Sequence, residues 1–291
     1  MLRSSLGYPT RPPHGGRVVL LSGLLVVLAW VLVGISTIEV GLFPLVFIGL
    51  ILWLVVRGYY VHVLRTTIGR ARPTPPPFSG YGRLLVDGIK SFLVVSVYLA
   101  PGILVFAGIV GVVGLEIDGV SGPILATGAG ILALAGMSYL AGALFIVPIA
   151  VARFAYTDRL GAAFEVRTNV DTAFSEDYAI AWIVAAGIQG ILVPLAYLLY
   201  PFVVGVFLRV YLSISVRYLY GGGVGAALEL DPVATPEKIH THDQSARSAL
   251  DRISDEDVTE LRSAIRPIAD DGFDSESGSD GIDEDDRNPP T

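Results

Sequence analysis

The sequence lacks cysteine and is poor in lysine. Without cysteine, disulfides, thiolate zinc sites and iron–sulfur clusters are excluded. Lysine occurs only at Lys90 and Lys238, against 18 arginines, and Asp outnumbers Glu by 17 to 10. Scarce lysine with abundant aspartate is typical of a salt-adapted proteome, so we expect the source to be a halophilic archaeon.

Charged side chains are scarce and unevenly placed. They make up 16% of the chain, against 53% hydrophobic residues, and the mean hydropathy is +0.63; a soluble domain has about 25% charged residues. Residues 1–224 carry 14 Lys and Arg with nine Asp and Glu, a net charge of +5, whereas residues 225–291 carry six and 18, a net of −12. The acidic pI of 5.1 therefore arises in the C-terminal tail.

Long runs without charge indicate an all-α integral membrane protein. The first run, Val18–Ile38, has 21 residues, about the 20 or so that cross a bilayer. A signal peptide would have a shorter apolar core, so we expect this helix to be retained. Further uncharged runs are Val40–Val56, Ser91–Leu115, Val120–Ala152 and 179–208.

The last of these runs is ambiguous. Its 30 uncharged residues would form a helix of about 45 Å, too long for one span, yet they are too few for two unless the second continues past Arg209. Basic residues gather in the N-terminal segment, in residues 57–90 and in residues 153–178, and positive loops face the cytoplasm. Five spans would leave Arg209 and Arg217 outside. We therefore predict six spans, arranged as three hairpins with both termini cytoplasmic and a turn near Leu199–Phe202.

Two stretches share a spacing pattern, "RGYYVHVLRTTIG" at 57–69 and "RVYLSISVRYLYG" at 209–221. We interpret both as cytoplasmic helix exits, where Tyr sits at the interface, Arg reaches lipid phosphates and Gly ends the helix. A dedicated lipid or substrate site is the alternative. The matched positions are Arg57, Tyr59, Arg65 and Gly69, and Arg209, Tyr211, Arg217 and Gly221.

The two arginines of each motif should lie at different depths. Eight helical residues separate them, or about 12 Å, which puts Arg65 and Arg217 at the phosphates and Arg57 and Arg209 deeper. A charge is costly in hydrocarbon, so we expect Arg57 and Arg209 to face the helix bundle.

The segments between hairpins contain further helix signals. "RLLVDGIKSF" at 83–92 has an apolar stripe, which predicts a short interfacial helix with an ion pair between Arg83 and Asp87. In "FSEDYAIAW" at 174–182, Ser175 is a candidate N-cap for the fifth span.

The expected spans carry little reactive chemistry. Spans one to five contain no ionisable side chain, and Gln189 is their only amide, which we expect to form an interhelical hydrogen bond. No aspartate pair is present in them, and no histidine could activate Ser138. We predict no catalytic residue, no cofactor, no metal site and no enzymatic activity.

The C-terminal tail, 225–291, is acidic and rich in Asp, Ser, Gly and Pro, which predicts disorder. One amphipathic helix is expected near residues 254–266, with an apolar stripe that ends at Ile268. Such a stripe on a tethered helix suits a protein partner bound through residues 254–268. We expect no nucleic-acid partner.

Three segments resemble a known family. "GYGRLLVDGIKSF", "FSEDYAIAW" and "VRYLYGGG" are similar to the prokaryotic membrane family called domain of unknown function 4013. The resemblance spans roughly Val40 to Gly223 and implies a multi-pass membrane protein without implying an activity. The residues that carry it are Gly80, Arg83, Leu84, Asp87, Gly88, Lys90, Tyr178, Trp182 and Gly221.

The sequence thus predicts a cytoplasmic segment (1–17), a six-helix membrane domain (18–224) and a cytoplasmic tail (225–291). We expect a non-enzymatic protein that organises or assists other components of the cell membrane. A permease or channel for a neutral or amphiphilic solute is the alternative.

Overall fold

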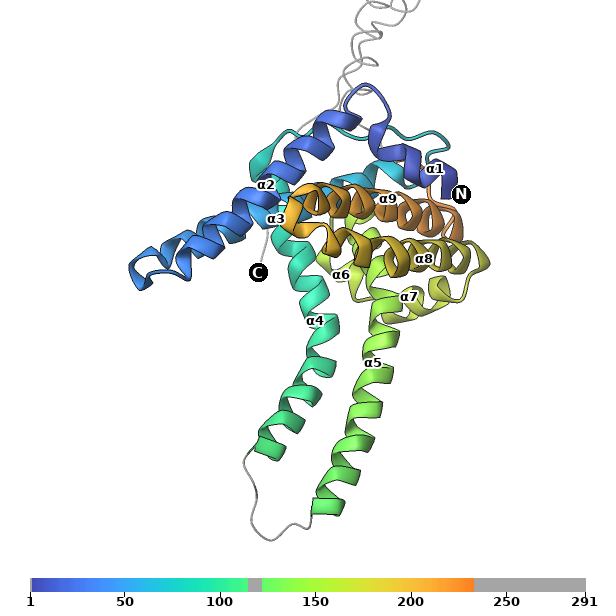
Figure 1. Cartoon of the computed structure of the whole chain (residues 1–291). Helices are drawn as coiled ribbons and strands as arrows, with labels where there is room; N and C mark the ends of the chain where they lie inside the picture. The colour runs from blue at the N-terminus through green and yellow to red at the C-terminus, as the bar shows by residue number, and fades with distance from the viewer. Residues whose placement is uncertain (1, 115–121, 233–291) are drawn as a thin grey trace, which may run out of the picture. The chain divides into compact units, whose positions relative to one another are not determined.

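The computed structural model describes residues 2–114 and 122–232, and all regular structure in these ranges is helical (Figure 1). The predicted tail helix at 254–268 lies outside the described residues. The longer helices are α2 (Gly15–Ser36), α3 (Pro44–Thr67), α4 (Tyr81–Gly114), α5 (Gly122–Thr157), α8 (Glu176–Leu198) and α9 (Val204–Ala227). Short helices are α1 (Leu2–Gly7), η1 (Tyr8–Thr10), η2 (Val40–Leu42), α6 (Leu160–Ala163), α7 (Val166–Ala173) and η3 (Tyr200–Phe202).

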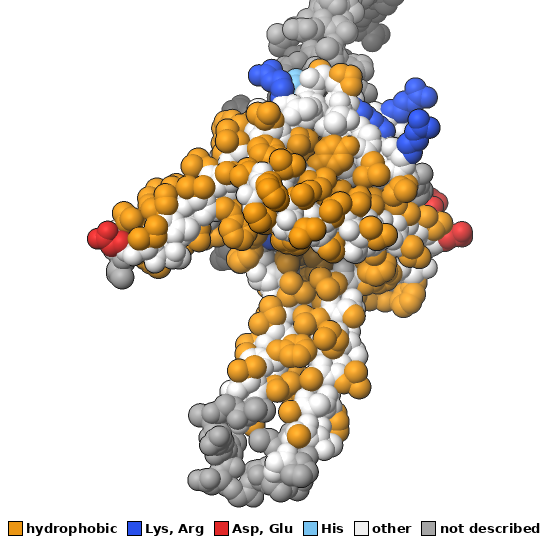
Figure 2. Space-filling view, in the orientation of Figure 1, with side chains coloured by type: hydrophobic (Ala, Val, Ile, Leu, Met, Phe, Trp, Pro, Cys, Tyr) orange, Lys and Arg blue, Asp and Glu red, His pale blue; other side chains and the backbone are white. Residues whose placement is uncertain are grey.

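Five helices are long and apolar enough to cross a membrane, and they correspond to the first five of the six predicted spans. α9 is not among them, because it carries Arg209 and Arg217 in its first two-thirds. Figure 2 shows hydrophobic side chains over α2, α4 and α5, with Lys and Arg side chains in separate groups along the upper edge of the view. The five candidate spans are Gly15–Ser36, Pro44–Thr67, Tyr81–Val112, Ala126–Thr157 and Glu176–Leu198.

Consecutive long helices pack in pairs, α2 with α3, α4 with α5, and α8 with α9. η3 joins α8 to α9 over Tyr200–Phe202, where the sequence predicts a turn. Ser175 caps α8 as expected, since its hydroxyl accepts a hydrogen bond from the Tyr178 amide at 3.4 Å.

A separate interfacial helix over 83–92 was wrongly predicted. These residues form the first turns of α4, which runs unbroken for 34 residues, or about 50 Å. The predicted pair between Arg83 and Asp87 was also wrong, because Asp87 pairs with Arg65 and Arg83 with Asp158. The apolar stripe that suggested a membrane surface, Leu85, Ile89 and Phe92, faces largely outward, since Ile89 and Phe92 are each 41% exposed. The side that packs against α3 carries Leu84 and Gly88.

Two glycines let α3 and α4 cross at very short range. A Cβ atom at Gly58 would lie 1.7 Å from the Leu84 carbonyl oxygen, and one at Gly88 would lie 1.9 Å from that of Leu54. Any side chain at these points would overlap the backbone of the opposite helix. The crossing brings the middle of α3 against the start of α4.

The two repeated motifs lie on neighbouring helices that run in the same direction. Along α3 and α9, Tyr60 contacts Arg217, Thr67 lies at Gly221, and Ile68 lies at Gly225. The two motifs are nevertheless displaced by two to five residues along the helices, so Arg217 lies beside Tyr60 and not beside its counterpart Arg65.

Only the first motif ends its helix at its glycine. Gly69, two residues after α3, has a φ of 70°, the left-handed conformation expected of a C-terminal cap. Gly221 was wrongly predicted to do the same, because α9 continues to Ala227. A Cβ at Gly221 would lie 2.0 Å from Thr67 Oγ1, so this glycine allows α3 and α9 to approach closely.

The N-terminal segment packs onto the helices. Tyr8 is fully buried, and its ring lies 4.8 Å from that of Tyr218 on α9. Arg11 donates a hydrogen bond to the Pro73 carbonyl at 3.1 Å and lies over both tyrosine rings. Residues 1–17 thus tie α9 to the proline-rich 73–77 segment, a role that composition alone did not indicate.

Candidate functional site

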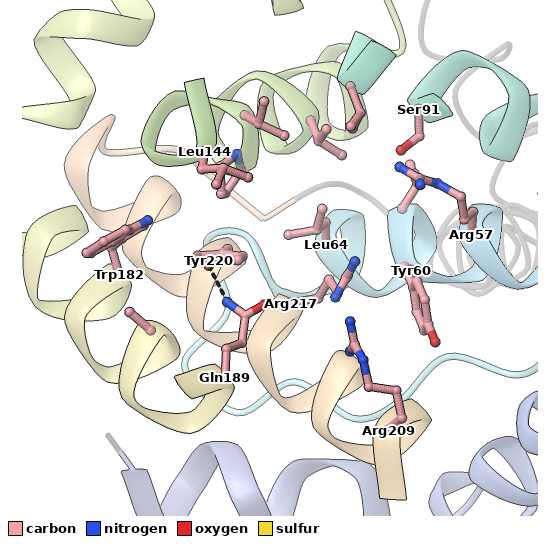
Figure 3. Close-up of a pocket in the computed structure, with 16 residues that line it drawn as sticks. Arg57, Tyr60, Leu64, Ser91, Leu144, Trp182, Gln189, Arg209, Arg217 and Tyr220 are labelled. Atoms are coloured by element: carbon pink, nitrogen blue, oxygen red, sulfur yellow. Dashed lines mark hydrogen bonds between the residues drawn. The ribbon is translucent and has the colours of Figure 1, made fainter. Parts of the chain in front are cut away.

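A cavity of about 590 Å³ lies among α3, α4, α5, α8 and α9 (Figure 3). Its polar lining includes three arginines: Arg57 from α3, and Arg209 and Arg217 from α9. Figure 3 shows their side chains reaching toward the space between these helices. The remaining polar residues of the lining are Tyr60, Ser91, Gln189 and Tyr220.

Aromatic rings hold Arg57 and Arg217. The Arg57 guanidinium lies 4.9 Å from the Trp53 ring centre and 5.8 Å from that of Phe92. The Arg217 guanidinium lies 4.4 Å from the Tyr60 ring centre and donates a hydrogen bond to the Ser213 carbonyl. Each contact is attractive, because a ring face is electronegative, but none of them neutralises a charge.

Arg209 is the third arginine of the cluster, and its guanidinium donates a hydrogen bond to the Ser213 hydroxyl. Arg57, Arg209 and Arg217 line the same cavity, so three like charges share one space. Throughout the described part of the chain, none of the three forms an ion pair, and the cavity lining contains no carboxylate. The cavity therefore concentrates three positive charges without a counter-charge from the described residues.

Gln189 and Tyr220 form the polar floor between α8 and α9. The Gln189 amide donates a hydrogen bond to the Tyr220 hydroxyl at 3.1 Å, which confirms the predicted interhelical bond. The bond leaves the Gln189 carbonyl oxygen and the Tyr220 hydroxyl hydrogen at the edge of the cavity.

The opposite wall is apolar. It is formed by Leu144, Val147, Pro148 and Val151 on α5, and by Trp182 and Ala186 on α8. Leu144 is 57% exposed, so the cavity reaches the molecular surface there. One cavity thus joins a cationic end to an apolar end that opens on a hydrophobic helix face.

Arg65 does not belong to this cavity. Its guanidinium pairs with Asp87 at 3.1 Å and with Asp158 at 3.3 Å, and its Nε donates to the Ala155 carbonyl at 2.8 Å. These contacts join the C-terminal ends of α3 and α5 to the N-terminal turns of α4. Arg65 is therefore neutralised within the chain, unlike the three cavity arginines.

A separate ion pair joins Arg153, near the end of α5, to Glu165, the residue before α7. Arg153 donates hydrogen bonds to the Glu165 carboxylate and to Asn169, and this guanidinium lowers the pKa of the exposed Glu165 carboxyl. The Asn169 amide also bonds the Ala163 carbonyl. This network anchors α7 to α5.

The structure groups the motif arginines differently from the sequence-based expectation. Arg57 and Arg209 do line an interhelical cavity, but Arg217, which was expected at the lipid phosphates beside Arg65, lines it too. A helical stripe could have shown this, since Arg209, Ser213, Arg217 and Tyr220 recur at spacings of three and four. Within the described ranges, no three His, Cys, Asp or Glu side chains come together as metal ligands.

Comparison with known proteins identifies a family without assigning an activity. No curated protein and no solved structure shows a significant match. Residues 41–200 match a family described as protein of unknown function DUF4013, which covers more than half of the chain and ends before α9. This match agrees with the resemblance carried by Gly88, Tyr178 and Trp182, and the chain belongs to this DUF4013 family of proteins of unknown function.

Proposed function

We propose that this protein spans the cell membrane of a halophilic archaeon six times, as three hairpins with both termini in the cytoplasm. The support is the charge of the loops, together with the five apolar helices and the 24-residue length of α9. Arg209 and Arg217 account for the low hydropathy of α9, and both side chains line the interhelical cavity.

Reporter fusions test this topology. Fusions after Gly41 and Gly119 should report an outside location, and a fusion after Pro232 should report the cytoplasm. The reason is that each pair of spans returns the chain to the side of its basic loops. An outside signal at Pro232 would leave five spans and remove α9 from the membrane.

We propose that the protein is a non-enzymatic binding protein that organises or assists other membrane components, with an anion held in the cavity. The observation that carries this proposal is the set of three arginines without a carboxylate. The three arginines are half-buried. Partial removal of a cation from water without a partner is unfavourable, and a bound anion would offset that cost. Transport of an amphiphilic solute is the second candidate, because the cavity has both a cationic and an apolar end.

Anion binding should appear as a change in thermal stability. A ligand at 100 times its Kd stabilises the folded state by about 2.7 kcal/mol. We expect inorganic phosphate or an anionic lipid to raise the Tm of the detergent-solubilised chain, compared with chloride at equal ionic strength. Arg217→Gln should remove this increase, because it removes a central cavity charge.

The matched control is Arg167→Gln, which removes an exposed arginine on α7. The control should keep the increase in Tm. Without any ligand, Arg217→Gln should be at least as stable as the natural chain, since it removes an unpaired charge. An equal response of both variants to every anion would contradict anion binding in the cavity.

We also propose that residues 254–268 bind a protein partner. Truncation after Pro232 removes this segment but keeps Leu228 and Leu230, which pack against the core. The truncated chain should accumulate in the membrane normally, while its partners disappear from affinity purification analysed by mass spectrometry. Degradation of the truncated chain would show that the tail is needed for folding instead.

A further inference from the structure

We propose that the cavity binds the phosphate headgroup of an anionic membrane lipid, with an acyl chain lying along the apolar wall between α5 and α8. This inference rests on the proposed anion-binding function and names the ligand. The shared chemistry is a phosphate anion; the lipid differs from a free ion by its hydrocarbon chain.

The cationic end has the donors that a phosphate needs. A guanidinium carries five N–H donors and binds phosphate oxygens in pairs. Within the described residues, Arg209 and Arg217 each donate one hydrogen bond to Ser213, and Arg57 donates none. Most of these donors remain for a ligand, and Ser91, which is 4% exposed, adds a hydroxyl to the lining.

The size of the cavity exceeds what a free phosphate would fill. Its volume of about 590 Å³ lies in the range of pockets that hold whole small molecules, roughly 300–1,000 Å³. A phosphate held by the arginines would leave the α5 and α8 side of the cavity empty. That side is lined by Leu144, Val147, Trp182 and Ala186, which offer contact to hydrocarbon and no hydrogen bond to water beyond the indole N–H.

An acyl chain could extend from the cavity directly into the bilayer. Leu144 lines the cavity and is also 57% exposed, on a helix that is apolar enough to span the membrane. α5 and α8 meet at Phe145. Its ring centre lies 5.0 Å from that of Trp182, and its backbone carbonyl accepts a hydrogen bond from the Tyr178 hydroxyl. This contact holds Trp182, which lines the cavity, beside α5 next to Leu144.

Native mass spectrometry of the full chain in mild detergent tests the proposal. The probes are phosphatidylglycerol, a diacylglycerol with the same chains, and inorganic phosphate. Phosphatidylglycerol should be retained most strongly, because only it fills both ends. Arg217→Gln and Arg209→Gln should each weaken its binding by about ten- to a hundredfold, the loss expected for one charged hydrogen-bonding partner, and Arg167→Gln should not.

A steric variant separates lipid from free anion. Ala186→Phe places a large side chain in the apolar end, away from the arginines. It should weaken phosphatidylglycerol binding about 5- to 150-fold, which corresponds to one to three kcal/mol of overpacking. It should leave the response to inorganic phosphate unchanged. Inorganic phosphate binding as tightly as the lipid, or no effect of Ala186→Phe, would overturn the lipid assignment while the anion-binding function stands. Failure of every anion to bind would overturn both.

Discussion

Gly88→Ala should prevent the protein from reaching a stable folded state, although it adds one methyl group. The new Cβ would lie 1.9 Å from the Leu54 carbonyl oxygen, and Leu54 is part of the α3 backbone. A backbone atom cannot rotate away as a side chain can, so α3 and α4 must separate. Overpacking of this kind costs about 1–3 kcal/mol when side chains can adjust, and we expect the upper end of that range or more.

Gly108→Ala on the same helix is the matched control. A Cβ there would meet nothing within 4 Å, so only the helix propensity changes. That change favours alanine by up to about 1 kcal/mol. Thermal unfolding in detergent and the amount of protein in the membrane should both fall for Gly88→Ala and stay level or rise for Gly108→Ala. Gly58→Ala, on the other side of the crossing, should behave like Gly88→Ala.

Matching losses at Gly88 and Gly108 would contradict this prediction. They would mean that alanine is harmful along α4 in general, or that the crossing is looser than the distance to Leu54 indicates. A double variant, Gly58→Ala with Gly88→Ala, tests whether the two substitutions destabilise the same crossing. If one methyl already separates the helices, the second should cost less than the first.

The apolar runs predicted the helices well because span length follows directly from bilayer thickness. The five runs correspond to α2, α3, α4, α5 and the α8–α9 pair, and the turn near Leu199–Phe202 is where η3 lies. The start of α4 was misread because this helix continues without a break into the third apolar run. An apolar stripe indicates a helix, but it does not show where that helix ends.

Glycines were interpreted least accurately. The sequence-based interpretation treated Gly221 as a helix end, and Gly88 entered only through the family resemblance. Both glycines in fact allow two helices to approach closely, α3 with α9 and α3 with α4. Such an approach depends on two segments that are distant in the sequence, so local spacing cannot show it. Gly69, whose role is local, was predicted correctly.

In the candidate site, too, local features could be predicted from the sequence and contacts between distant segments could not. The repeat drew attention to four arginines, and three of them line the cavity. Arg65 differs from Arg217 because Asp87 and Asp158 lie beside it, and these carboxylates come from α4 and from the residue after α5. Arg217, at the equivalent position on α9, has no carboxylate beside it among the described residues. Charge balance is thus a property of the assembled helices, and equal spacing in the sequence does not imply an equal role.

The pairing of Arg65 leads to the second large effect, which is expected for Asp87→Asn. The Asp87 side chain is 4% exposed and that of Arg65 is 12% exposed. Removal of one partner from a buried pair costs about 3–5 kcal/mol, because the other charge stays buried without compensation. Asp158 remains near Arg65 but is half exposed, so we expect the lower part of that range. The measurement is the free energy of unfolding in detergent with increasing denaturant.

Arg83→Gln provides the control, since the pair between Arg83 and Asp158 is exposed on both sides and should contribute at most about 1 kcal/mol. The double variant Arg65→Met with Asp87→Leu removes both buried charges and keeps apolar volume. It should recover most of the stability lost in Asp87→Asn, because replacing a whole buried pair is often neutral. A double variant as unstable as the single one would show that Arg65 acts mainly through its 2.8 Å hydrogen bond to the Ala155 carbonyl, which joins α3 to α5.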